Sequence, residues 1–395
     1  MIIKPRIKGF VCITSHPTGC LENIREQANY AASQKILSNQ TPQRVLVIGS
    51  STGYGLASRI SAAFSCGADT LGVYFERPPT DERTASAGFY NSQAFCKLAR
   101  EQGHKAEDIN GDAFSNEIKD EVMAKAKEFG GQFELVIYSL ASPRRTDPKD
   151  DSTYRACLKP IGAVYKNKTL DTDKKEVKDI TIEPASDDEI YQTEKVMGGE
   201  DWELWTDALL GANLLSSDCL NIAYSYIGPQ VTQPIYRNGT IGRAKLHLEN
   251  TAERITEKMT KAGSGKAYVS VNKALVTQAS SAIPVVPLYV SILYKIMTAK
   301  GTHEGCIEQT CRLFKDRLYG ESKISVDEEQ RIRLDDWEMD PEVQQKIIEI
   351  WPHVNTGNLS ELTDFDIYQK EFLKLFGFGR NDVDYEAEVD PAATI

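Results

Sequence analysis

A tyrosine and a lysine, Tyr236 and Lys245, stand nine positions apart in the stretch IYRNGTIGRAK. A phenol can donate a hydrogen bond to a substrate oxygen, and a nearby ammonium can bind a cofactor or favour phenolate character in the tyrosine. On one uninterrupted helix, nine steps of about 100° would place them on opposite faces. Gly239 and Gly242 lie between them, so we expect the chain to bend there and bring the pair together. The alternative is a surface turn with an exposed lysine.

The segment RVLVIGSSTGYGLASRISAAF has the pattern of a nucleotide-binding turn. A buried strand is predicted at residues 45 to 48, followed by glycines and then by a helix. Gly49, Gly53 and Gly55 would let backbone amides approach a pyrophosphate at the start of that helix. No Gly-Lys-Ser/Thr follows, which excludes a P-loop. The segment therefore predicts a dinucleotide site.

The second predicted strand, TLGVYFE, ends at Glu76. A carboxylate there would accept hydrogen bonds from the adenosine ribose and repel a 2′-phosphate, which favours NADH. Arg77 leaves another reading open, since an arginine here could bind that phosphate, and a plain charged pair at a strand end is a third. Asp112 and Ala113 follow the third predicted strand and would flank the adenine. The stretch SLASP at 139 to 143 follows the fourth strand, at the same edge of the sheet.

Strand and helix alternate in the first part of the chain, which predicts parallel pairing with right-handed crossovers. We expect an α/β fold, a Rossmann-like doubly wound parallel sheet in one elaborated domain over residues 1 to 395. Its core is expected at about 40 to 145 and 219 to 330. Residues 146 to 218 are interpreted as an insertion with a small β-hairpin and pocket helices, and residues 331 to 395 as a helical C-terminal extension.

Composition argues against several classes of partner. The formal net charge of -11 argues against broad nucleic-acid binding and against an anionic membrane surface. The eight cysteines include no C-x-x-C pair, so no metal site is expected, and without a signal peptide we expect reduced thiols in the cytoplasm. The apolar run AIPVVPLYVSIL at 282 to 293 is shorter than the ~20 residues of a membrane span. It is predicted to be either core or the wall of an apolar pocket.

Short stretches along nearly the whole chain match those of one known family. They are MIIKPRIKGFVCITSHPTGC, GYGLASRI, YNSQAF, GDAFS, YSLASP, VMGGEDWELW, AYSYIG, IYRNGTIGRAK, LVTQASSAIPVVPLY and HEGCIEQ. With these, the sequence resembles the trans-2-enoyl-CoA reductases of the FabV class. The resemblance implies a monomeric reductase of Rossmann-like fold that uses NADH to saturate the 2,3 double bond of an enoyl thioester. One departure is Phe89, where related sequences tend to have tryptophan.

The resemblance also implies roles for individual residues. Tyr236 is similar to the catalytic acid of that family, Tyr226 to a second phenol at the thioester, and Lys245 to the lysine that orients the cofactor. Trp202 and Trp205 are interpreted as packing residues. The positions that resemble contacts to NADH, besides Lys245, are Gly49, Ser50, Ser51, Thr52, Gly53, Tyr54, Phe75, Glu76, Asp112, Ala113, Leu140, Ala141, Leu275, Val276 and Thr277. The last three resemble the segment that frames the nicotinamide carboxamide.

These roles agree with the chemistry of enoyl reduction. Hydride arriving at C3 leaves negative charge on the thioester oxygen, and a donor aimed at that oxygen stabilises the transition state. We expect NADH-dependent reduction of short trans-2-enoyl-CoA, with crotonyl-CoA as the first substrate to test. One alternative is the same reaction on acyl carrier protein in fatty-acid synthesis, which would need a basic patch at the pocket mouth because that carrier is acidic. Another is a catalytically silent NAD-binding sensor.

Overall fold

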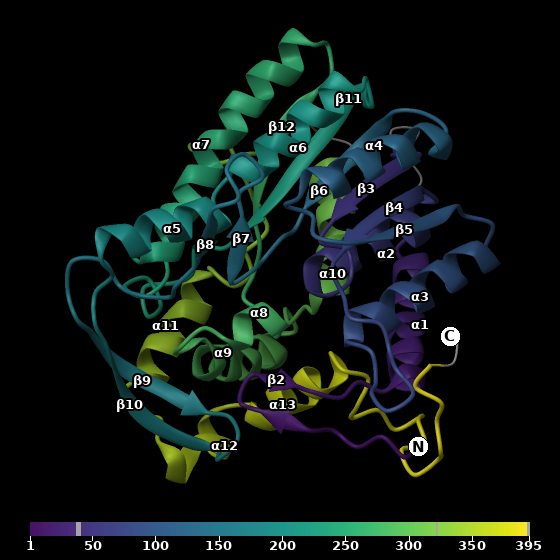
Figure 1. Ribbon diagram of the computed structural model, residues 1–395. Coiled ribbons are helices and arrows are strands. Elements are labelled where there is room, and N and C mark those ends of the chain that lie inside the picture. The colour runs from purple at the N-terminus through teal and green to yellow at the C-terminus, as the bar shows by residue number, and fades with distance from the viewer. Residues whose placement is uncertain (37–40, 321–322, 393–395) are drawn as a thin grey trace.

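The computed structural model describes residues 1–36, 41–320 and 323–392. Within them, the centre of the molecule is a seven-stranded sheet in the order β13-β12-β11-β6-β3-β4-β5 (Figure 1). Every neighbouring pair in this sheet is parallel. The strands are β3 (Arg44–Ile48), β4 (Asp69–Tyr74), β5 (Ala106–Asn110), β6 (Phe133–Tyr138), β11 (Leu215–Ser225), β12 (Lys266–Val271) and β13 (Arg331–Arg333). The strand order reverses between β3 and β6, which makes a switch point where such sheets bind ligands.

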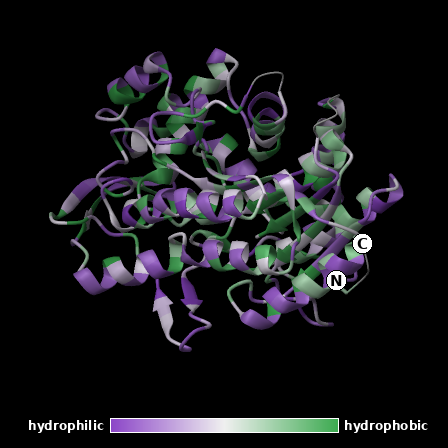
Figure 2. Cartoon of the chain, turned by 90° about the horizontal axis from the view of Figure 1, so that it is seen from above, coloured by the Kyte–Doolittle hydropathy of each residue, from purple (hydrophilic) through white to green (hydrophobic). Residues whose placement is uncertain are grey.

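Helices cover both faces of this sheet. Leu46 and Ile48 of β3 pack in the cluster that contains the helices of one face, and Val45 and Val47 pack in the cluster of the other. Because both faces are covered, the strand reads as a continuous apolar run, and hydrophobic residues gather on the inner strands in Figure 2. The covering elements are α4 (Asn116–Phe129), α6 (Glu200–Gly211) and α7 (Thr240–Lys261) on the first face, and α2 (Gly53–Cys66) and the π-helix η1 (Leu313–Leu318) on the second.

Helix α3 (Ala87–Glu101) lies beside α2 on the second face of the sheet, where its apolar residues share a cluster with Ala106 of β5. Two further helices form an outer layer: α1 (Pro17–Ser33) packs against α2 and α3, and α10 (Cys306–Arg312) packs against α2.

The predicted α/β doubly wound sheet is confirmed, but its limits differ from those expected. β13 lies beyond residue 330, where the core was expected to end, and it is hydrogen-bonded to β12 as the edge strand. Helix α6, expected among the pocket helices, packs on the sheet through Trp202 and Trp205. Both tryptophans are fully buried, which agrees with the packing role predicted for them. The boundary expected at about residue 40 lies outside the described residues.

The insertion contains two antiparallel hairpins where the sequence predicted one. A short one pairs β7 (Arg144–Thr146) with β8 (Thr153–Arg155), and a longer one pairs β9 (Tyr165–Asp171) with β10 (Glu176–Ile182). Helix α5 (Asp187–Met197) follows and packs beside α7. The segments are rich in charged residues, so their sequence did not show that the chain turns back twice to form two hairpins.

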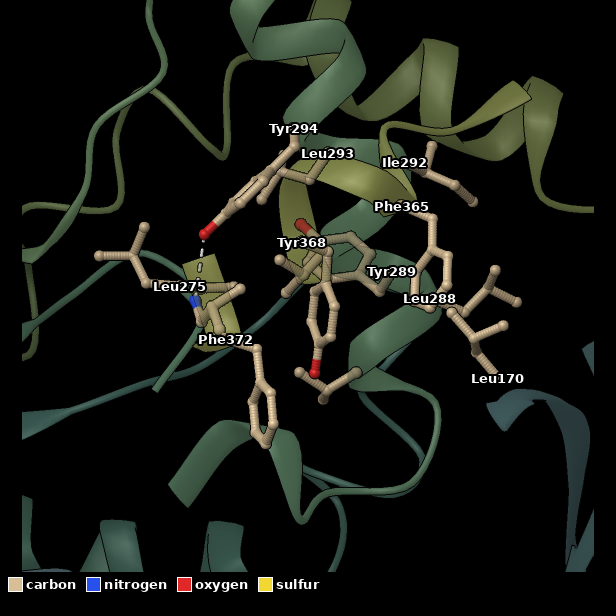
Figure 3. Packing of buried hydrophobic residues seen from close by; sticks show 14 of the residues in the cluster. Leu170, Leu275, Leu288, Tyr289, Ile292, Leu293, Tyr294, Phe365, Tyr368 and Phe372 are labelled. Atoms are coloured by element: carbon tan, nitrogen blue, oxygen red, sulfur yellow. Dashed lines mark hydrogen bonds between the residues drawn. The ribbon is translucent and has the colours of Figure 1, made fainter. Parts of the chain in front are cut away.

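A mostly helical layer lies beyond the carboxyl end of the sheet (Figure 1). The apolar run at 282 to 293 forms most of α9, whose residues Leu288, Tyr289 and Leu293 have no exposed surface. Figure 3 shows these side chains among those of α13, which supports the core alternative for this run. The other elements are β1 (Ile7–Lys8), β2 (Val11–Cys12), α8 (Gln278–Ser281), α9 (Val286–Lys300), α11 (Pro341–Ile350), the 3-10 helix η2 (Thr356–Asn358), α12 (Leu359–Leu362) and α13 (Phe365–Lys374).

Three further observations concern the residues that the structure describes. None of their helices is both long and apolar enough to cross a membrane. No group of three or more His, Cys, Asp or Glu side chains among them could hold a metal ion. All eight cysteines are free thiols, and five of them are buried.

Candidate active site

The glycine turn after β3 lies at the switch point of the sheet. Gly49 has φ of +88°, and a Cβ there would lie 2.3 Å from the carbonyl oxygen of Ser139, which follows β6. A Cβ on Gly55 would lie 1.9 Å from the carbonyl oxygen of Gly49, so the turn and the first turn of α2 touch through backbone. Thr52 precedes α2 and makes no capping bond with its side chain. The first amides of α2 are therefore left for a phosphate.

Glu76 is held beside this turn. The Ser51 hydroxyl donates a hydrogen bond of 2.7 Å to its Oε1, and its backbone is fixed by two hydrogen bonds with the Asn110 side chain. A Cβ on Gly88 would lie 2.0 Å from the same Oε1, so that glycine makes room for the carboxylate. The strand-end carboxylate thus faces the cradle predicted for the cofactor, while Phe75 before it is 74% exposed.

We expect Glu76→Ala to weaken the preference for NADH. Removing the carboxylate removes its repulsion of a 2′-phosphate, so the ratio of kcat/KM for NADH over NADPH should fall about tenfold, a change of about 1.4 kcal/mol. Steady-state kinetics with both cofactors would measure it. Glu82→Ala is the matched control, because Glu82 is exposed on the same loop. A parent protein that already works better with NADPH would contradict this assignment.

Four other residues predicted to contact the cofactor also lie at the carboxyl edge of the sheet. Asp112 follows β5, and its Oδ1 accepts a 3.0 Å hydrogen bond from the Phe114 amide. Ala113 is buried, and its carbonyl accepts a 3.0 Å bond from the Trp205 indole. Leu140 and Ala141 follow β6, directly after the residue that faces Gly49.

The segment predicted to frame the nicotinamide, Leu275 to Thr277, follows β12. The Val276 amide donates a 3.1 Å hydrogen bond to the Tyr294 hydroxyl of α9, the dashed line in Figure 3. Thr277 caps α8 by accepting a 3.0 Å bond from the Ser280 amide, and its methyl group lies 3.6 Å from where a Cβ on Gly53 would be. The fold thus brings this segment against the glycine turn.

Not every residue of the predicted cradle faces an open site. The Tyr54 hydroxyl lies 2.6 Å from the Lys273 carbonyl oxygen and 2.9 Å from Gln309 Oε1. Burial raises its pKa well above the ordinary value. Tyr54 therefore ties α2 to the loop after β12 with its hydroxyl, and only the rest of the residue is left to meet a cofactor.

The chain bends between Tyr236 and Lys245, as predicted. Residues 230 to 238 form successive turns, and α7 begins at Thr240 with Gly239 as its N-cap. The Tyr236 carbonyl accepts hydrogen bonds from the amides of Gly239 at 3.1 Å and Gly242 at 3.0 Å, which closes the turn onto the helix. A Cβ on Gly242 would lie 1.8 Å from the Arg237 carbonyl oxygen. Glycine at 242 is what allows this close approach.

We expect Gly242→Ala to destabilise the protein by about 1–3 kcal/mol, the usual cost of forcing extra volume into a packed region. The obstacle is backbone, so the turn that carries Tyr236 must move away from α7. Urea unfolding would measure the loss of stability, and turnover should fall with it. Gly211→Ala at the end of α6 is the control, since a Cβ there meets nothing within 4 Å. Equal stability of the two variants would contradict the need for glycine at 242.

Tyr236, which is buried, and Tyr226, which is partly buried, form a pair of phenols beside the end of β11. Their ring centroids are 4.9 Å apart in an edge-to-face arrangement. The Tyr226 hydroxyl donates a 3.0 Å hydrogen bond to Glu338 Oε1, whereas the Tyr236 hydroxyl has no hydrogen-bond partner in the described part of the chain. Burial raises the pKa of Tyr236, so this phenol stays protonated at neutral pH. Tyr236 is therefore protonated and has an O–H that is available to donate a hydrogen bond.

Lys245 lies on α7 and reaches the same end of β11. Its Nζ donates a 3.0 Å hydrogen bond to the Tyr224 carbonyl oxygen, and no other bond to it is found among the described residues. Burial lowers the pKa of Lys245 to about 8, although the Glu249 carboxylate acts in the opposite direction. Lys245 was expected to give Tyr236 phenolate character. In the structure its ammonium bonds to the Tyr224 carbonyl instead, and burial raises the pKa of Tyr236. The ammonium instead keeps free N–H groups that could bind a ribose.

Three buried residues at this edge were missed by the sequence analysis: Lys273, Tyr289 and Glu338. The Glu338 carboxylate accepts hydrogen bonds from the hydroxyls of Tyr226 and Tyr289 and from the Ala274 amide. Lys273 donates to two backbone carbonyls, and burial lowers its pKa to about 8. Tyr289 ends the family-like stretch LVTQASSAIPVVPLY but was read only as part of an apolar run. Lys273 belongs to no recognisable motif, and Glu338 stands in the acidic stretch LDDWEMD. Only the folded chain brings them together.

Comparison with known proteins agrees with this geometry. A family model described as the trans-2-enoyl-CoA reductase catalytic region matches residues 83–319, and the NAD(P)H binding domain of trans-2-enoyl-CoA reductase matches residues 2–81. The chain belongs to the trans-2-enoyl-CoA reductase family. Membership makes this protein an oxidoreductase that acts on a carbon–carbon double bond with NADH.

Relatives of this reductase match over nearly the whole chain. Proteins named enoyl-[acyl-carrier-protein] reductase [NADH] from Opitutus terrae and Coxiella burnetii are 56% and 54% identical over 391 residues, with 99% of this chain and 99% and 96% of those proteins covered. A Treponema denticola trans-2-enoyl-CoA reductase in complex with NAD superposes with a TM-score of 0.95 at 46% identity. The Clostridium acetobutulicum enzyme in complex with NADH gives 0.95 at 42%. Both structures cover 99% of this chain, and 98% of each is covered.

The C-terminal segment of the reductase, residues 326–389, matches a model described as an enoyl reductase FAD binding domain. Its residues do not fit a flavin dinucleotide. Such a site needs a glycine turn and a helix N-terminus beyond a strand. β13 is instead followed by Leu334, Asp335 and Asp336, whose carboxylates are paired with arginines, and the next glycine in the sequence is Gly357. The buried face of the segment packs against α9.

Proposed function

We propose that the reductase saturates the 2,3 double bond of short trans-2-enoyl-CoA with NADH, and that Tyr236 is the donor at the thioester oxygen. The observation that supports this most directly is the Tyr236 phenol, which is buried, protonated and without a hydrogen-bond partner in the described chain. Tyr236 comes after β11, whose end is contacted by Lys245. The glycine turn after β3 lies at the same carboxyl edge of the sheet. The family of the chain supplies the reaction class.

Bound NADH would supply a hydride to C3 of the enoyl group. The chain's own part is to bind and to orient. Amides of the turn from Gly49 to Tyr54 would hold the pyrophosphate, and Glu76 and Lys245 would bind the two ribose groups. Tyr236 would donate its O–H toward the thioester oxygen, where negative charge collects as the hydride arrives. The completed reaction adds one hydride at C3 and one proton at C2.

The carrier of the acyl group has two candidates. Solved trans-2-enoyl-CoA reductases at 42% and 46% identity support CoA. Relatives at 54% and 56% identity that are named for acyl carrier protein support the alternative, a step of fatty-acid synthesis. We favour CoA as the first substrate to test, because a CoA thioester does not require a docking surface for a carrier protein.

We further infer that the protein works as a cytoplasmic monomer without nucleic-acid or membrane partners, and as a single domain. The net charge of -11 supports the absence of polyanionic partners. The bonds of Glu338, from the C-terminal extension, to Tyr226 and Ala274 support one functional unit. Light scattering at working concentration would test the monomer, and a mass near twice 44.0 kDa would contradict it.

The decisive experiment is the loss of NADH absorbance with crotonyl-CoA. The assay is repeated with NADPH and with crotonyl-acyl carrier protein, so that cofactor and carrier are compared under the same conditions. Oxidation with the CoA thioester at a kcat/KM above that for the carrier-protein thioester supports the proposal. A reversed order would favour the fatty-acid-synthesis alternative. NADH binding without oxidation on either carrier would favour a catalytically silent sensor.

A further inference from the structure

Glu338 is a buried carboxylate from the C-terminal extension that reaches the site. It lies in the turn between β13 and α11 and has no exposed surface. Its Oε1 accepts hydrogen bonds from Tyr289 at 2.6 Å and Tyr226 at 3.0 Å, and its Oε2 accepts one from the Ala274 amide at 2.7 Å. Three donors therefore converge on one side chain. Burial raises the pKa of Glu338, whereas the hydrogen bonds from Tyr289 and Ala274 favour its ionised form.

This carboxylate determines where the Tyr226 proton points. A phenol has a single O–H, and in Tyr226 that O–H is directed at Glu338. The Tyr226 oxygen can then only accept further hydrogen bonds, so it does not compete with Tyr236 as a donor to the substrate. The Tyr226 ring, held in this direction, packs by its edge-to-face contact against Tyr236. This differs from the role of a second donor that the resemblance implied for Tyr226.

The same carboxylate fixes the backbone that leads into the nicotinamide segment. The Ala274 amide donates to Glu338, and the Ala274 carbonyl accepts a 3.3 Å bond from the buried Lys273 ammonium. Both sides of this residue are therefore held by charged groups, immediately before Leu275. A charge buried this deeply costs free energy, and no side-chain cation lies within ion-pairing distance of Glu338 in the described chain. An uncharged side chain would cost less if stability alone mattered.

We propose that Glu338 is a positioning residue of the reductase: it turns the Tyr226 proton away from the substrate and holds the Tyr226 ring so that Tyr236 is the sole phenol donor. This inference rests on the proposed function of Tyr236. It also assigns to the C-terminal segment a role in the site that needs no flavin. Glu338 acts through Tyr226 and does not touch the reacting atoms.

The test uses Glu338→Gln, which keeps the size of the side chain and reverses the two hydrogen bonds at Oε1. The amide oxygen can still accept from Ala274, but the NH₂ group then faces the hydroxyls of Tyr226 and Tyr289 and must donate to them. We expect kcat with crotonyl-CoA to fall about tenfold, in the range of a hydrogen bond to a charged group, with the NADH dissociation constant unchanged. Glu338→Asp keeps the charge and should retain more activity than the glutamine variant. Glu328→Gln, an exposed neighbour in the sequence, is the control.

A double-mutant cycle separates positioning from a general structural role. If Glu338 acts through Tyr226, adding Glu338→Gln to Tyr226→Phe should lower kcat no further than Tyr226→Phe alone. Multiplying effects, or a Glu338→Gln variant as active as the parent, would overturn the inference even if Tyr236→Phe abolishes turnover. Full turnover by Tyr236→Phe would instead overturn the proposed function itself. If Glu338→Gln does not fold, the same cycle is run with Glu338→Asp.

Discussion

Tyr236→Phe is expected to lower kcat with crotonyl-CoA on the order of 10²–10³-fold, the usual effect of removing one donor to a developing oxyanion. The phenol is buried and has no hydrogen-bond partner in the described chain, so removing its oxygen breaks no bond that holds the fold. The dissociation constant of NADH should therefore stay unchanged. Stopped-flow reduction and fluorescence titration with NADH would give the two numbers separately.

Tyr268→Phe is the matched control for this prediction. Tyr268 is a half-buried tyrosine on β12 that packs in the cluster on the face of the sheet with η1. Its variant should turn over like the parent. Parent-like turnover in Tyr236→Phe would remove the phenol from the mechanism. A Tyr236→Phe protein that loses NADH binding as well as turnover would show that the tyrosine serves the fold.

Lys245→Ala is expected to weaken NADH binding and lower kcat/KM, each by about 10- to 100-fold. This range corresponds to a hydrogen bond with a charged group, worth about 1.5–3 kcal/mol. In the structure the ammonium makes one bond, to the Tyr224 carbonyl, so most of its donors remain for the cofactor. Unaltered kinetics in Lys245→Ala would make it a structural lysine.

The same lysine predicts an alkaline limb in the pH profile. Burial lowers the pKa of Lys245 to about 8, so the ammonium is present below that pH and is lost above it. The value of kcat/KM for NADH, which reports the free enzyme, should therefore fall as pH rises through about 8. Lys245→Arg keeps its charge at all these pH values, so its profile should stay level even at a lower rate. A fall of the same shape in Lys245→Arg would place the titration on another group.

Local sequence patterns were enough to predict the strand, glycine turn and helix at which we propose that the cofactor binds. The turn at Gly49 follows a strand that is apolar on both faces. Its glycines are required by backbone contacts within the turn and with Ser139, which follows the adjacent strand β6. Such contacts involve neighbours in sequence or adjacent parallel strands, so they leave a readable pattern. The bend at Gly239 was predictable for the same reason.

The acceptor of the Tyr226 proton was not predictable in this way. Glu338 lies 112 positions from Tyr226 in sequence. Nothing in its own stretch separates it from the acidic residues around it, some of which are exposed or paired with arginine. The edge strand β13 was missed because only three of its residues pair with β12, too few to produce an alternating pattern. Both features depend on where the end of the chain packs, which local periodicity does not encode.

The late position of Glu338 in the chain has a consequence for synthesis on the ribosome. The strands β3 to β6 and their helices are complete within the first 138 residues, so the cofactor-binding half has its own elements early. The edge strand and the acceptor for Tyr226 are made only after residue 330. Domains generally fold as they emerge, and an incomplete parallel sheet leaves a strand edge exposed. Until its final sixth is translated, a nascent chain of this reductase therefore has an uncovered β12 edge and no acceptor for the Tyr226 proton. Chaperone protection should matter most before that last segment is made.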